Sequence, residues 1–224
     1  MTSRCEAFYN AHISKYIENF KSIEHCFTEE SIIFDVGSNI GLFSLAICES
    51  NKYNKIYLFE PSTELINYSK TDTLKNYQNI HYINKGASDT NETITLYKNR
   101  DSNIGWNTCY KYDPVQENGV IPVSNMDKEE ISVITLDSFC ETEGITKIDF
   151  IKIDVEGLEF KVINGFLNTL SKLKKKPYLY VEVGWGTSHP EWEKVNTIYE
   201  ELFKIGYKRV TFTNKTEDIL FIPL

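Results

Sequence analysis

The sequence predicts an α/β fold: a three-layer α/β/α sandwich around a mostly parallel seven-stranded sheet that closes with a C-terminal antiparallel hairpin. Apolar runs typical of buried strands alternate with helical segments through the first five strands, which favours parallel crossovers. Two extended segments then follow one another across a single turn, which predicts a hairpin and not another crossover. Because 224 residues can bury a substantial core, we expect one domain over residues 1–224.

The first expected element is a helix over residues 6–27, where apolar side chains recur with helical spacing. The residues that define this spacing are Ile13, Tyr16, Ile17, Phe20, Ile23 and Phe27. We expect this amphipathic helix to pack over the sheet.

A buried strand followed by a glycine turn lies at residues 32–41, which read Ile-Ile-Phe-Asp-Val-Gly-Ser-Asn-Ile-Gly. The strand, 31–36, runs into Gly37, and a helix over about 40–50 begins beside Gly41. Glycines let the backbone approach a ligand where a Cβ would clash, and a new helix offers free N–H groups over the turn. The turn is therefore a candidate ligand site.

A second strand, 55–60, ends on Glu60, nineteen positions after Gly41. An acid about 20 residues beyond such a turn lies at the tip of the second strand, where it can accept hydrogen bonds from both hydroxyls of a ribose. The two motifs together predict a nucleoside-containing ligand across the first two strand tips.

This ligand is expected to lack a pyrophosphate. In dinucleotide-binding turns a middle glycine lets the pyrophosphate touch the backbone, and Asn39 stands at that position here. No Walker lysine follows the turn either. S-adenosylmethionine, which joins adenosine to an amino acid through a sulfonium, fits better, and Asp35 could balance its ammonium group. A nicotinamide or flavin dinucleotide, and a turn that binds nothing, are the alternatives.

The remaining elements continue the alternation. Ser62 begins a helix that runs to about residue 75, and a third strand at 79–84 leads into Gly86, Ala87 and Ser88. These small residues suit the flat edge of an adenine, although a plain turn explains them as well. Further on we expect extended segments at 92–97 and 131–135, helices at 136–144, 158–171 and 191–205, and strands at 148–153, 177–183, 207–212 and 219–222.

Residues 99–130 interrupt this rhythm with little periodicity. Loops of this length in a compact domain are usually functional or disordered, so the segment is interpreted as a lid or a wall of the acceptor site. It contains Trp106, and a later loop contains Trp185. Either tryptophan could stack on a sugar face, or could pack as an ordinary core residue.

Charged residues gather where two later strands end. Lys152, Asp154 and Glu156 surround the end of one apolar strand, and Glu182 ends the next. Charges at a central strand tip are costly unless they are paired or used, and this edge of an open α/β sheet faces the ligand crevice. We expect these residues to lie on the acceptor side of the site.

Composition excludes some classes of function. A net charge of −8 and a pI of about 5.1 argue against a nucleic-acid substrate, which demands a basic face. No apolar run is long enough to span a membrane, and the N-terminus lacks a signal-peptide pattern. Five cysteines without a Cys-x-x-Cys pair indicate reduced thiols, so we expect a cytoplasmic protein.

Five segments carry a resemblance to a known family: 34–41 (Phe-Asp-Val-Gly-Ser-Asn-Ile-Gly), 59–61 (Phe-Glu-Pro), 86–89 (Gly-Ala-Ser-Asp), 135–137 (Thr-Leu-Asp) and 152–157 (Lys-Ile-Asp-Val-Glu-Gly). In this order they resemble the FkbM-type methyltransferases, over about residues 30–212. The resemblance implies a class I, Rossmann-like fold and S-adenosylmethionine-dependent O-methylation. It also implies a small-molecule or glycan acceptor, since members act on hydroxyls of sugars, polyketides and related natural products.

The resemblance also implies roles for individual residues. The methionine side would be lined by Asp35, Gly37, Ser38, Asn39 and Gly41, the ribose would meet Glu60, and the adenine would meet Ala87 and Ser88. Pro61, Ser62, Gly86 and Asp154 are expected beside the cofactor too. Ser38 departs from the commoner alanine, a change expected to matter little.

Methyl transfer to a hydroxyl needs the acceptor oxygen near the methyl group and a way to remove its proton. In one route His189 is the general base, since an unperturbed histidine titrates near 6.5. In the other, Asp154 and Glu182, with Glu156 as a further candidate, hold a divalent cation such as Mg²⁺ or Ca²⁺ that polarises the hydroxyl. The structural alternatives are a histidine that caps helix 191–205, and acids that hold Lys152 without metal.

Two other classes of function stay open at this point. One is a nicotinamide-dependent oxidoreductase, against which Asn39 and the closing hairpin argue. The other is a non-catalytic nucleoside-binding module that retains the fold. The oligomeric state is not predicted.

Overall fold

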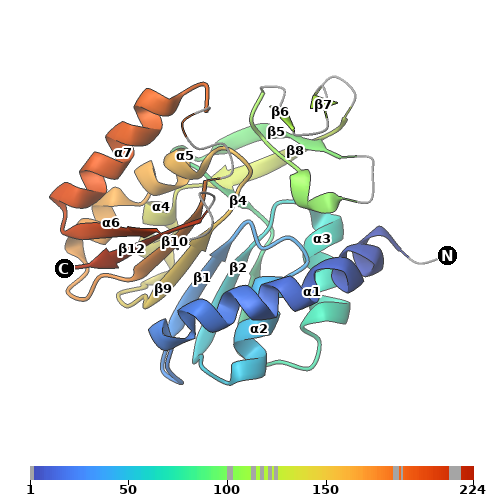
Figure 1. Cartoon of the computed structure of the whole chain (residues 1–224), viewed down its shortest axis with the longest axis horizontal. Coiled ribbons are helices and arrows are strands. Elements are labelled where there is room, and N and C mark those ends of the chain that lie inside the picture. Colours follow the sequence, from blue (N-terminus) through green and yellow to red (C-terminus); the bar gives the residue numbers. More distant parts are fainter. Residues whose placement is uncertain are drawn as a thin grey trace.

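The computed structural model describes residues 3–99, 103–111, 115–116, 119–120, 123, 126–183, 187, 189–211 and 218–224. Its centre is a seven-stranded sheet with the order β11-β12-β10-β9-β1-β2-β3 (Figure 1). The strands are β1 Ile32–Val36, β2 Lys55–Phe59, β3 Ile80–Ile83, β9 Phe150–Ile153, β10 Tyr178–Glu182, β11 Tyr207–Thr211 and β12 Asp218–Pro223.

Five of these strands run parallel, from β3 through β2, β1 and β9 to β10. Strand β12 lies between β10 and β11 and is antiparallel to both. The fold class expected from the sequence is therefore confirmed, including the closing hairpin. One consequence matters for the site: the carboxyl ends of the parallel strands and the start of β12 share one edge of the sheet, where Glu182 is paired with Asp218.

Helices cover both faces of the sheet. They are α1 Arg4–Ile23, α2 Leu42–Ser50, α3 Thr63–Tyr68, α4 Leu136–Glu143, α5 Glu159–Asn164, α6 Leu167–Lys172 and α7 Trp192–Lys204. Successive strand residues point to opposite faces, so Ile33 packs with residues of α1 and α2. Phe34 packs instead with residues of α4 to α7. Burial on both faces explains why the central strands read as continuous apolar runs.

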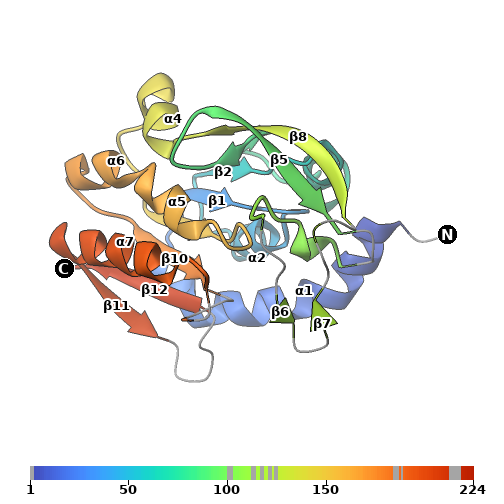
Figure 2. The ribbon, with the colours of Figure 1, turned by 90° about the horizontal axis from the view of Figure 1, so that it is seen from above.

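A second, three-stranded sheet has the order β4-β8-β5 and comprises β4 Gly86–Ala87, β5 Glu92–Lys98 and β8 Asp127–Ile134. Figures 1 and 2 both place β5 and β8 side by side, away from the hairpin of β11 and β12. The sequence predicts extended segments at 92–97 and 131–135 but not their pairing. Since β8 begins at Asp127, the end of the irregular segment 99–130 belongs to a strand.

Three helices differ from expectation. Helix 158–171 is two helices, α5 and α6, which are separated at Gly165 and Phe166. A Cβ at Gly165 would lie 2.2 Å from the carbonyl oxygen of Ser88, so this position has no room for a side chain. The helix expected to reach residue 75 ends at Tyr68 and continues as a π-helical turn, Ser69–Thr73. The lead helix ends at Ile23 and is followed by a 3-10 turn, Glu24–Cys26.

The described part of segment 99–130 includes a 3-10 helix, η3 Ile104–Trp106, and a β-bridge between Thr108 and Tyr97. It also includes the short strand pair of β6 Val115–Gln116 and β7 Gly119–Val120. Among the described helices, none is long and apolar enough to cross a bilayer.

Candidate functional site

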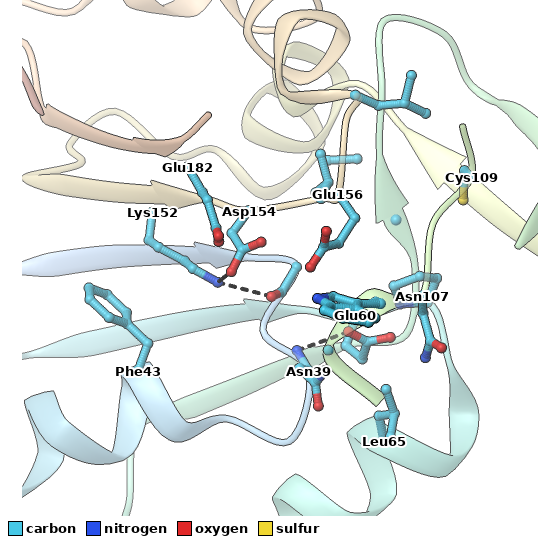
Figure 3. A pocket seen from close by; sticks show the side chains of 18 of the residues that line it. Asn39, Phe43, Glu60, Leu65, Asn107, Cys109, Lys152, Asp154, Glu156 and Glu182 are labelled. Carbon is cyan, nitrogen blue, oxygen red and sulfur yellow. Dashed lines mark hydrogen bonds and ion pairs between the residues drawn. The ribbon is translucent and has the colours of Figure 1, made fainter. Parts of the chain in front are cut away.

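A pocket lies along the carboxyl edge of the large sheet. Topology fixes the order of the residues that line it, from one side of the sheet to the other. That order is Asp218 at the start of β12, Glu182 at the end of β10, Asp154 after β9, Gly37 after β1, Glu60 after β2 and Gly86 after β3. Figure 3 shows the acids of β9 and β10 on one side of this pocket and Asn39 and Glu60 on the other.

The glycine turn is held in a conformation that excludes a side chain. Gly37 has φ +74°, and a Cβ there would lie 1.7 Å from the carbonyl oxygen of Asp154. Asn39 has φ +52°, and its backbone N–H donates to Glu60 Oε2 at 2.9 Å. Its side-chain amide donates to the carbonyl of Ile104 at 2.9 Å. The turn is therefore fixed to the neighbouring strand tips and to η3 at once.

Glu60 is buried, 6% exposed, and still lines the pocket. Its Oε1 accepts the N–H of Ser62 at 2.8 Å, so each carboxylate oxygen holds one backbone donor and keeps a further acceptor position. Burial raises the pKa of Glu60 to about 7, against the opposing effect of these two hydrogen bonds. Glu60 thus lines the pocket at the tip of β2 with a pKa near neutrality, and its contact with a ribose stays a prediction.

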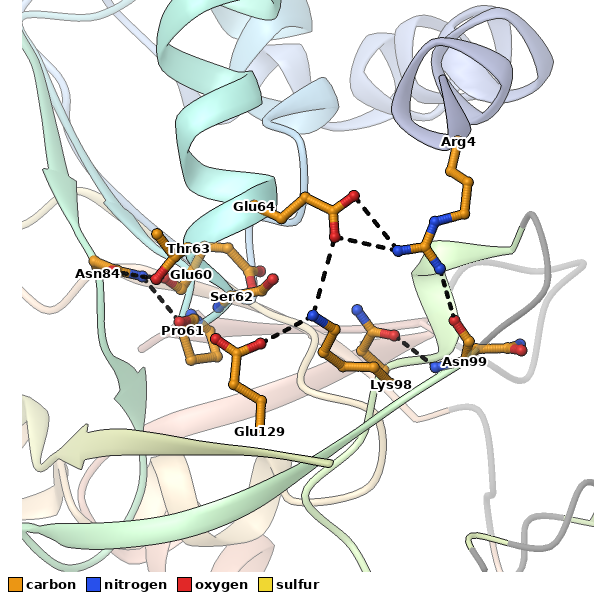
Figure 4. Close-up of polar contacts among 11 residues, drawn as sticks. Arg4, Glu60, Pro61, Ser62, Thr63, Glu64, Asn84, Lys98, Asn99 and Glu129 are labelled. Atoms are coloured by element: carbon orange, nitrogen blue, oxygen red, sulfur yellow. Dashed lines mark hydrogen bonds and ion pairs between the residues drawn. The ribbon is translucent and has the colours of Figure 1, made fainter. Parts of the chain in front are cut away.

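Polar contacts hold the loop that carries Glu60 and Pro61 (Figure 4). The side-chain amide of Asn84 donates to the carbonyls of Glu60 and Pro61, at 3.0 and 2.9 Å. Farther along, Arg4 of α1 pairs with Glu64 of α3 at 3.1 Å, and Lys98 of β5 pairs with Glu129 of β8 at 3.0 Å. Because Lys98 also lies 4.0 Å from Glu64, these contacts tie α1, α3 and the small sheet together.

Asp35 does not line the pocket. Its side chain is fully buried on the α1 and α2 face of the sheet, where Ser44 Oγ donates to it at 2.6 Å. Directly opposite on β9 is Lys152, whose ammonium lies 3.8 Å from Asp35. Burial raises the pKa of Asp35, although the charge of Lys152 opposes the shift. Lys152 thus lines the pocket and Asp35 does not. The predicted contact between Asp35 and the ammonium group of the cofactor stays a prediction, and Lys152 already lies 3.8 Å from this carboxylate.

Lys152 lines the pocket floor and is 4% exposed. Its ammonium donates to the Gly37 carbonyl at 3.1 Å and meets Asp154 Oδ2 at 2.8 Å. Burial alone would lower the pKa of Lys152, but the charges of Asp154 and Asp35 outweigh it and hold the pKa above its usual value. Lys152 therefore joins the glycine turn that follows β1 to Asp154, which follows β9.

Two further acids complete this side of the pocket. The charge of Asp154, followed by burial, raises the pKa of Glu182 well above its ordinary value. Burial, followed by the charge of Asp154, does the same to Glu156, which has a left-handed φ of +55°. A non-glycine residue in that region is strained, and such residues cluster at functional sites.

These acids do not form a metal centre. Within the described ranges, no group of three or more His, Cys, Asp or Glu side chains is arranged to hold a metal ion. Asp154 already meets the ammonium of Lys152, whose charge would repel a cation at this position. The expected Mg²⁺ or Ca²⁺ site at Asp154 and Glu182 is therefore not supported.

His189 lies outside the pocket lining and is 6% exposed. Its Nδ1 accepts the backbone N–H of Glu191 at 3.0 Å, at the start of α7, and its Nε2 lies 2.8 Å from the Gly157 carbonyl, to which it can donate. These are the contacts of a histidine that caps a helix, the structural alternative expected above. With both ring nitrogens engaged, His189 is not proposed as a general base.

The other predicted residues divide in the same way. Pro61, Ala87 and Trp106 line the pocket together with Gly37, Asn39, Glu60, Gly86, Lys152, Asp154, Glu156 and Glu182, and Trp106 is 40% exposed. Ser38, Gly41, Ser62 and Ser88 do not line it, and Ser62 and Ser88 are buried. Trp185 falls outside the described residues. Their roles toward a ligand stay predictions.

The sequence interpretation missed one wall of the pocket, which α1 supplies through Phe8, His12, Lys15, Tyr16 and Asn19. The signal was present: these polar and aromatic residues recur three or four positions apart, so they share one helix face. An apolar wall from Ile94, Leu96, Ile131 and Val133 was also missed, because it depends on the pairing of β5 with β8.

Comparison with known proteins gives consistent matches. The model of the FkbM methyltransferase domain matches residues 35–209. Hexuronic acid methyltransferase AglP of Haloferax volcanii is 26% identical over 167 residues, which cover 75% of this chain and 62% of that protein. Methyltransferase 1 of Beauveria bassiana is 26% identical over 151 residues, covering 62% and 59%. The chain thus spans about three fifths of the length of these curated relatives.

Among solved structures, SMU.1697c of Streptococcus mutans, in complex with SAH, superimposes with a TM-score of 0.55 and 11% identity. The match covers 92% of this chain and 96% of that one, and at this identity it shows the shared fold.

Proposed function

The chain belongs to the family of FkbM methyltransferase domains, and we propose that it transfers a methyl group from S-adenosylmethionine to a hydroxyl oxygen of a sugar, a glycan or a glycosylated natural product. The observation that carries the proposal is the Glu60 carboxylate, which lines the pocket one strand away from a glycine turn. In this turn Asn39 stands where a dinucleotide-binding turn has its middle glycine. The hexuronic acid methyltransferase among the relatives supports a sugar acceptor.

The residues of the pocket fit this cofactor. Glu60 keeps acceptor positions for two ribose hydroxyls, and the turn at Gly37 brings the backbone to the pocket without a side chain. Gly86 and Ala87, beside the apolar side chains of β5 and β8, leave a flat apolar space for an adenine. When bound, S-adenosylmethionine supplies an electrophilic methyl group on a sulfonium.

The acceptor would lie over the tips of β9 and β10, where Asp154 and Glu182 line the pocket. A carboxylate whose pKa is raised is a stronger base than an ordinary carboxylate. Glu182 is therefore suited to remove the proton from the acceptor hydroxyl. Lys152 holds Asp154 in place through its ion pair. We assign the general base to this pair of acids in place of His189.

Two measurements test the proposal. Calorimetry with S-adenosylmethionine and SAH should show binding, and incubation with labelled S-adenosylmethionine and a panel of glycosides should label a carbohydrate. Absence of cofactor binding would refute the proposal as a whole. Cofactor binding with label on a non-carbohydrate acceptor would refute the sugar alone. The oxidoreductase alternative would instead require stabilisation by a reduced nicotinamide.

A further inference from the structure

The charges along the pocket are unevenly distributed. Over the tips of β1 to β3, Glu60 is the acid that lines the pocket, whereas beside β9, β10 and β12 there are four more, Asp154, Glu156, Glu182 and Asp218. Opposite these tips, α1 contributes Tyr16 and Asn19. We call this region, Tyr16, Asn19, Asp154, Glu182 and Asp218, the acceptor half, because the proposed cofactor position leaves it open.

Tyr16 shows that α1 faces the acidic tips. Burial, helped by the nearby charges of Asp154 and Glu182, holds the pKa of Tyr16 above its ordinary value, although the charge of Lys152 opposes this shift. Asn19 lies one helical turn farther along the same face. A ligand in the acceptor half would therefore lie between α1 and these carboxyl groups.

The two lysines that line the pocket are either paired with protein oxygen atoms or exposed to solvent. Lys15 and Lys152 are the lysines or arginines that line the pocket within the described ranges. The ammonium of Lys152 has three donors and three oxygen neighbours, in Gly37, Asp154 and Asp35. Lys15 is exposed, and burial lowers the pKa of His12, which favours its neutral form. An acceptor carboxylate or phosphate would thus meet one buried cation among the described residues, Lys152, whose ammonium already lies against three oxygen atoms of the protein.

Glu156 adds to the asymmetry. Figure 3 shows its carboxyl group directed toward the same space as those of Asp154 and Glu182. Among the described hydrogen bonds no donor reaches this carboxyl group, although its backbone carbonyl accepts from Thr108 at 2.7 Å. The field is strong enough that the charge of Asp154 is the first cause of the raised pKa of Glu182.

We infer that the acceptor half selects an uncharged, hydroxyl-bearing acceptor and rejects an anionic one, with Glu182 and Asp154 as the residues that determine this specificity. The inference rests on the proposed function for the position of the cofactor. Carboxyl groups accept hydrogen bonds from sugar hydroxyls, whereas recognition of a carboxylate or phosphate uses arginine or lysine donors. A neutral hexoside should therefore be a better acceptor than the matching hexuronide or sugar phosphate.

A thiol placed in the acceptor half tests this inference without knowledge of the acceptor. In the Asn19→Cys variant, the rate of alkylation by neutral iodoacetamide is compared with that by anionic iodoacetate. Adducts at position 19 are followed by peptide mass spectrometry, so reaction of the partly buried Cys109 is not counted. The ratio of the two rates cancels any effect on the pKa of the new thiol. Ser14→Cys, at an exposed position of α1 outside the pocket lining, is the matched control.

We expect the iodoacetate-to-iodoacetamide ratio at position 19 to be about tenfold or more below that at position 14, because one or more like charges act at short range. When Glu182→Gln is added to the Asn19→Cys variant, the iodoacetate-to-iodoacetamide ratio at position 19 should rise several-fold. Glu193 is an exposed acid of α7, and adding Glu193→Gln instead should leave this ratio unchanged. Equal ratios at the two positions, or a ratio that Glu182→Gln leaves unchanged, would overturn the inference.

The same variant tests the position of the cofactor. After complete reaction with iodoacetamide, the Asn19→Cys protein should bind SAH within about threefold of its unmodified affinity, because the cofactor is placed over β1 to β3. A loss of SAH affinity would overturn the division of the pocket. If the unmodified wild-type protein does not bind SAH, the proposed function fails, whereas the alkylation ratios still decide the charge selectivity.

Discussion

At the scale of single residues, Glu60 combines burial, contact with the pocket and a pKa of about 7. Position and ionisation of this carboxylate can therefore be tested separately.

Replacement of Glu60 by glutamine should weaken the binding of S-adenosylmethionine by about 1.5–3 kcal/mol, as for loss of hydrogen bonds to a charged group. Calorimetry measures the change. The control is Glu64→Gln, because Glu64 is an exposed acid in the first turn of α3 and does not line the pocket. An unaltered affinity in Glu60→Gln would show that Glu60 does not bind the ribose.

Ionisation of Glu60 predicts a pH dependence. Below pH 7 the carboxyl group is increasingly protonated and accepts hydrogen bonds less well, so affinity for S-adenosylmethionine should rise with pH through 7 and level off above it. At pH 6 the contribution of Glu60 should reduce affinity about tenfold relative to the plateau. The relevant measurement is the difference between wild type and Glu60→Gln across pH 5.5–8.5, which removes the titration of the cofactor. Parallel curves would contradict the prediction.

The pairing of Asp35 with Lys152 is a second residue-scale feature. Lys152→Met should destabilise the fold by about 3–5 kcal/mol, since it leaves Asp35 buried without its cation. Adding Asp35→Asn should recover part of this loss, because the two residues interact directly. Urea unfolding of both single variants and the double variant measures the coupling. Strict additivity would show that the 3.8 Å contact contributes nothing to stability.

At the scale of elements, the junction between β1 and β9 depends on Gly37. Gly37→Ala should cost about 2–4 kcal/mol, because the new Cβ would meet the Asp154 carbonyl and the residue has a positive φ. Gly144→Ala separates the two causes: φ is +64°, but nothing lies within 4 Å of its Cβ, so the cost should be about 1–2 kcal/mol. Equal losses in urea unfolding would mean that the close approach is relieved without cost.

How far the sequence predicts the structure depends on whether a feature is local. The first strand, the glycine turn and Glu60 all lie within residues 32–60. Their positions at the edge of the sheet could therefore be predicted from this one segment. The orientation of Asp35 could not, because it depends on the register that sets it opposite Lys152, over one hundred positions away. The wall formed by α1 and the pairing of β5 with β8 likewise depend on contacts between distant segments. The contact of His189 with the Glu191 N–H is local, but whether its other ring nitrogen is free to act as a base depends on the Gly157 carbonyl, 32 positions away.

At the scale of the whole molecule, binding of a ligand across the sheet edge should stabilise the fold. S-adenosylmethionine at one hundred times its dissociation constant should raise the melting temperature by about 5–10 °C. NAD⁺ at the same concentration should leave it unchanged. Differential scanning calorimetry distinguishes the outcomes, and a shift with NAD⁺ alone would favour the oxidoreductase alternative.

Asn39 joins the turn at the end of β1 to the Ile104 carbonyl of the segment that carries Trp106. Asn39 and Trp106 both line the pocket, so a ligand that shifts this hydrogen bond from one side would change the other side as well. By thermodynamic reciprocity, if the first ligand changes the affinity for the second by some factor, the second must change the affinity for the first by the same factor. If both ligands bind better when this hydrogen bond is formed, each will raise the affinity for the other, whichever is added first.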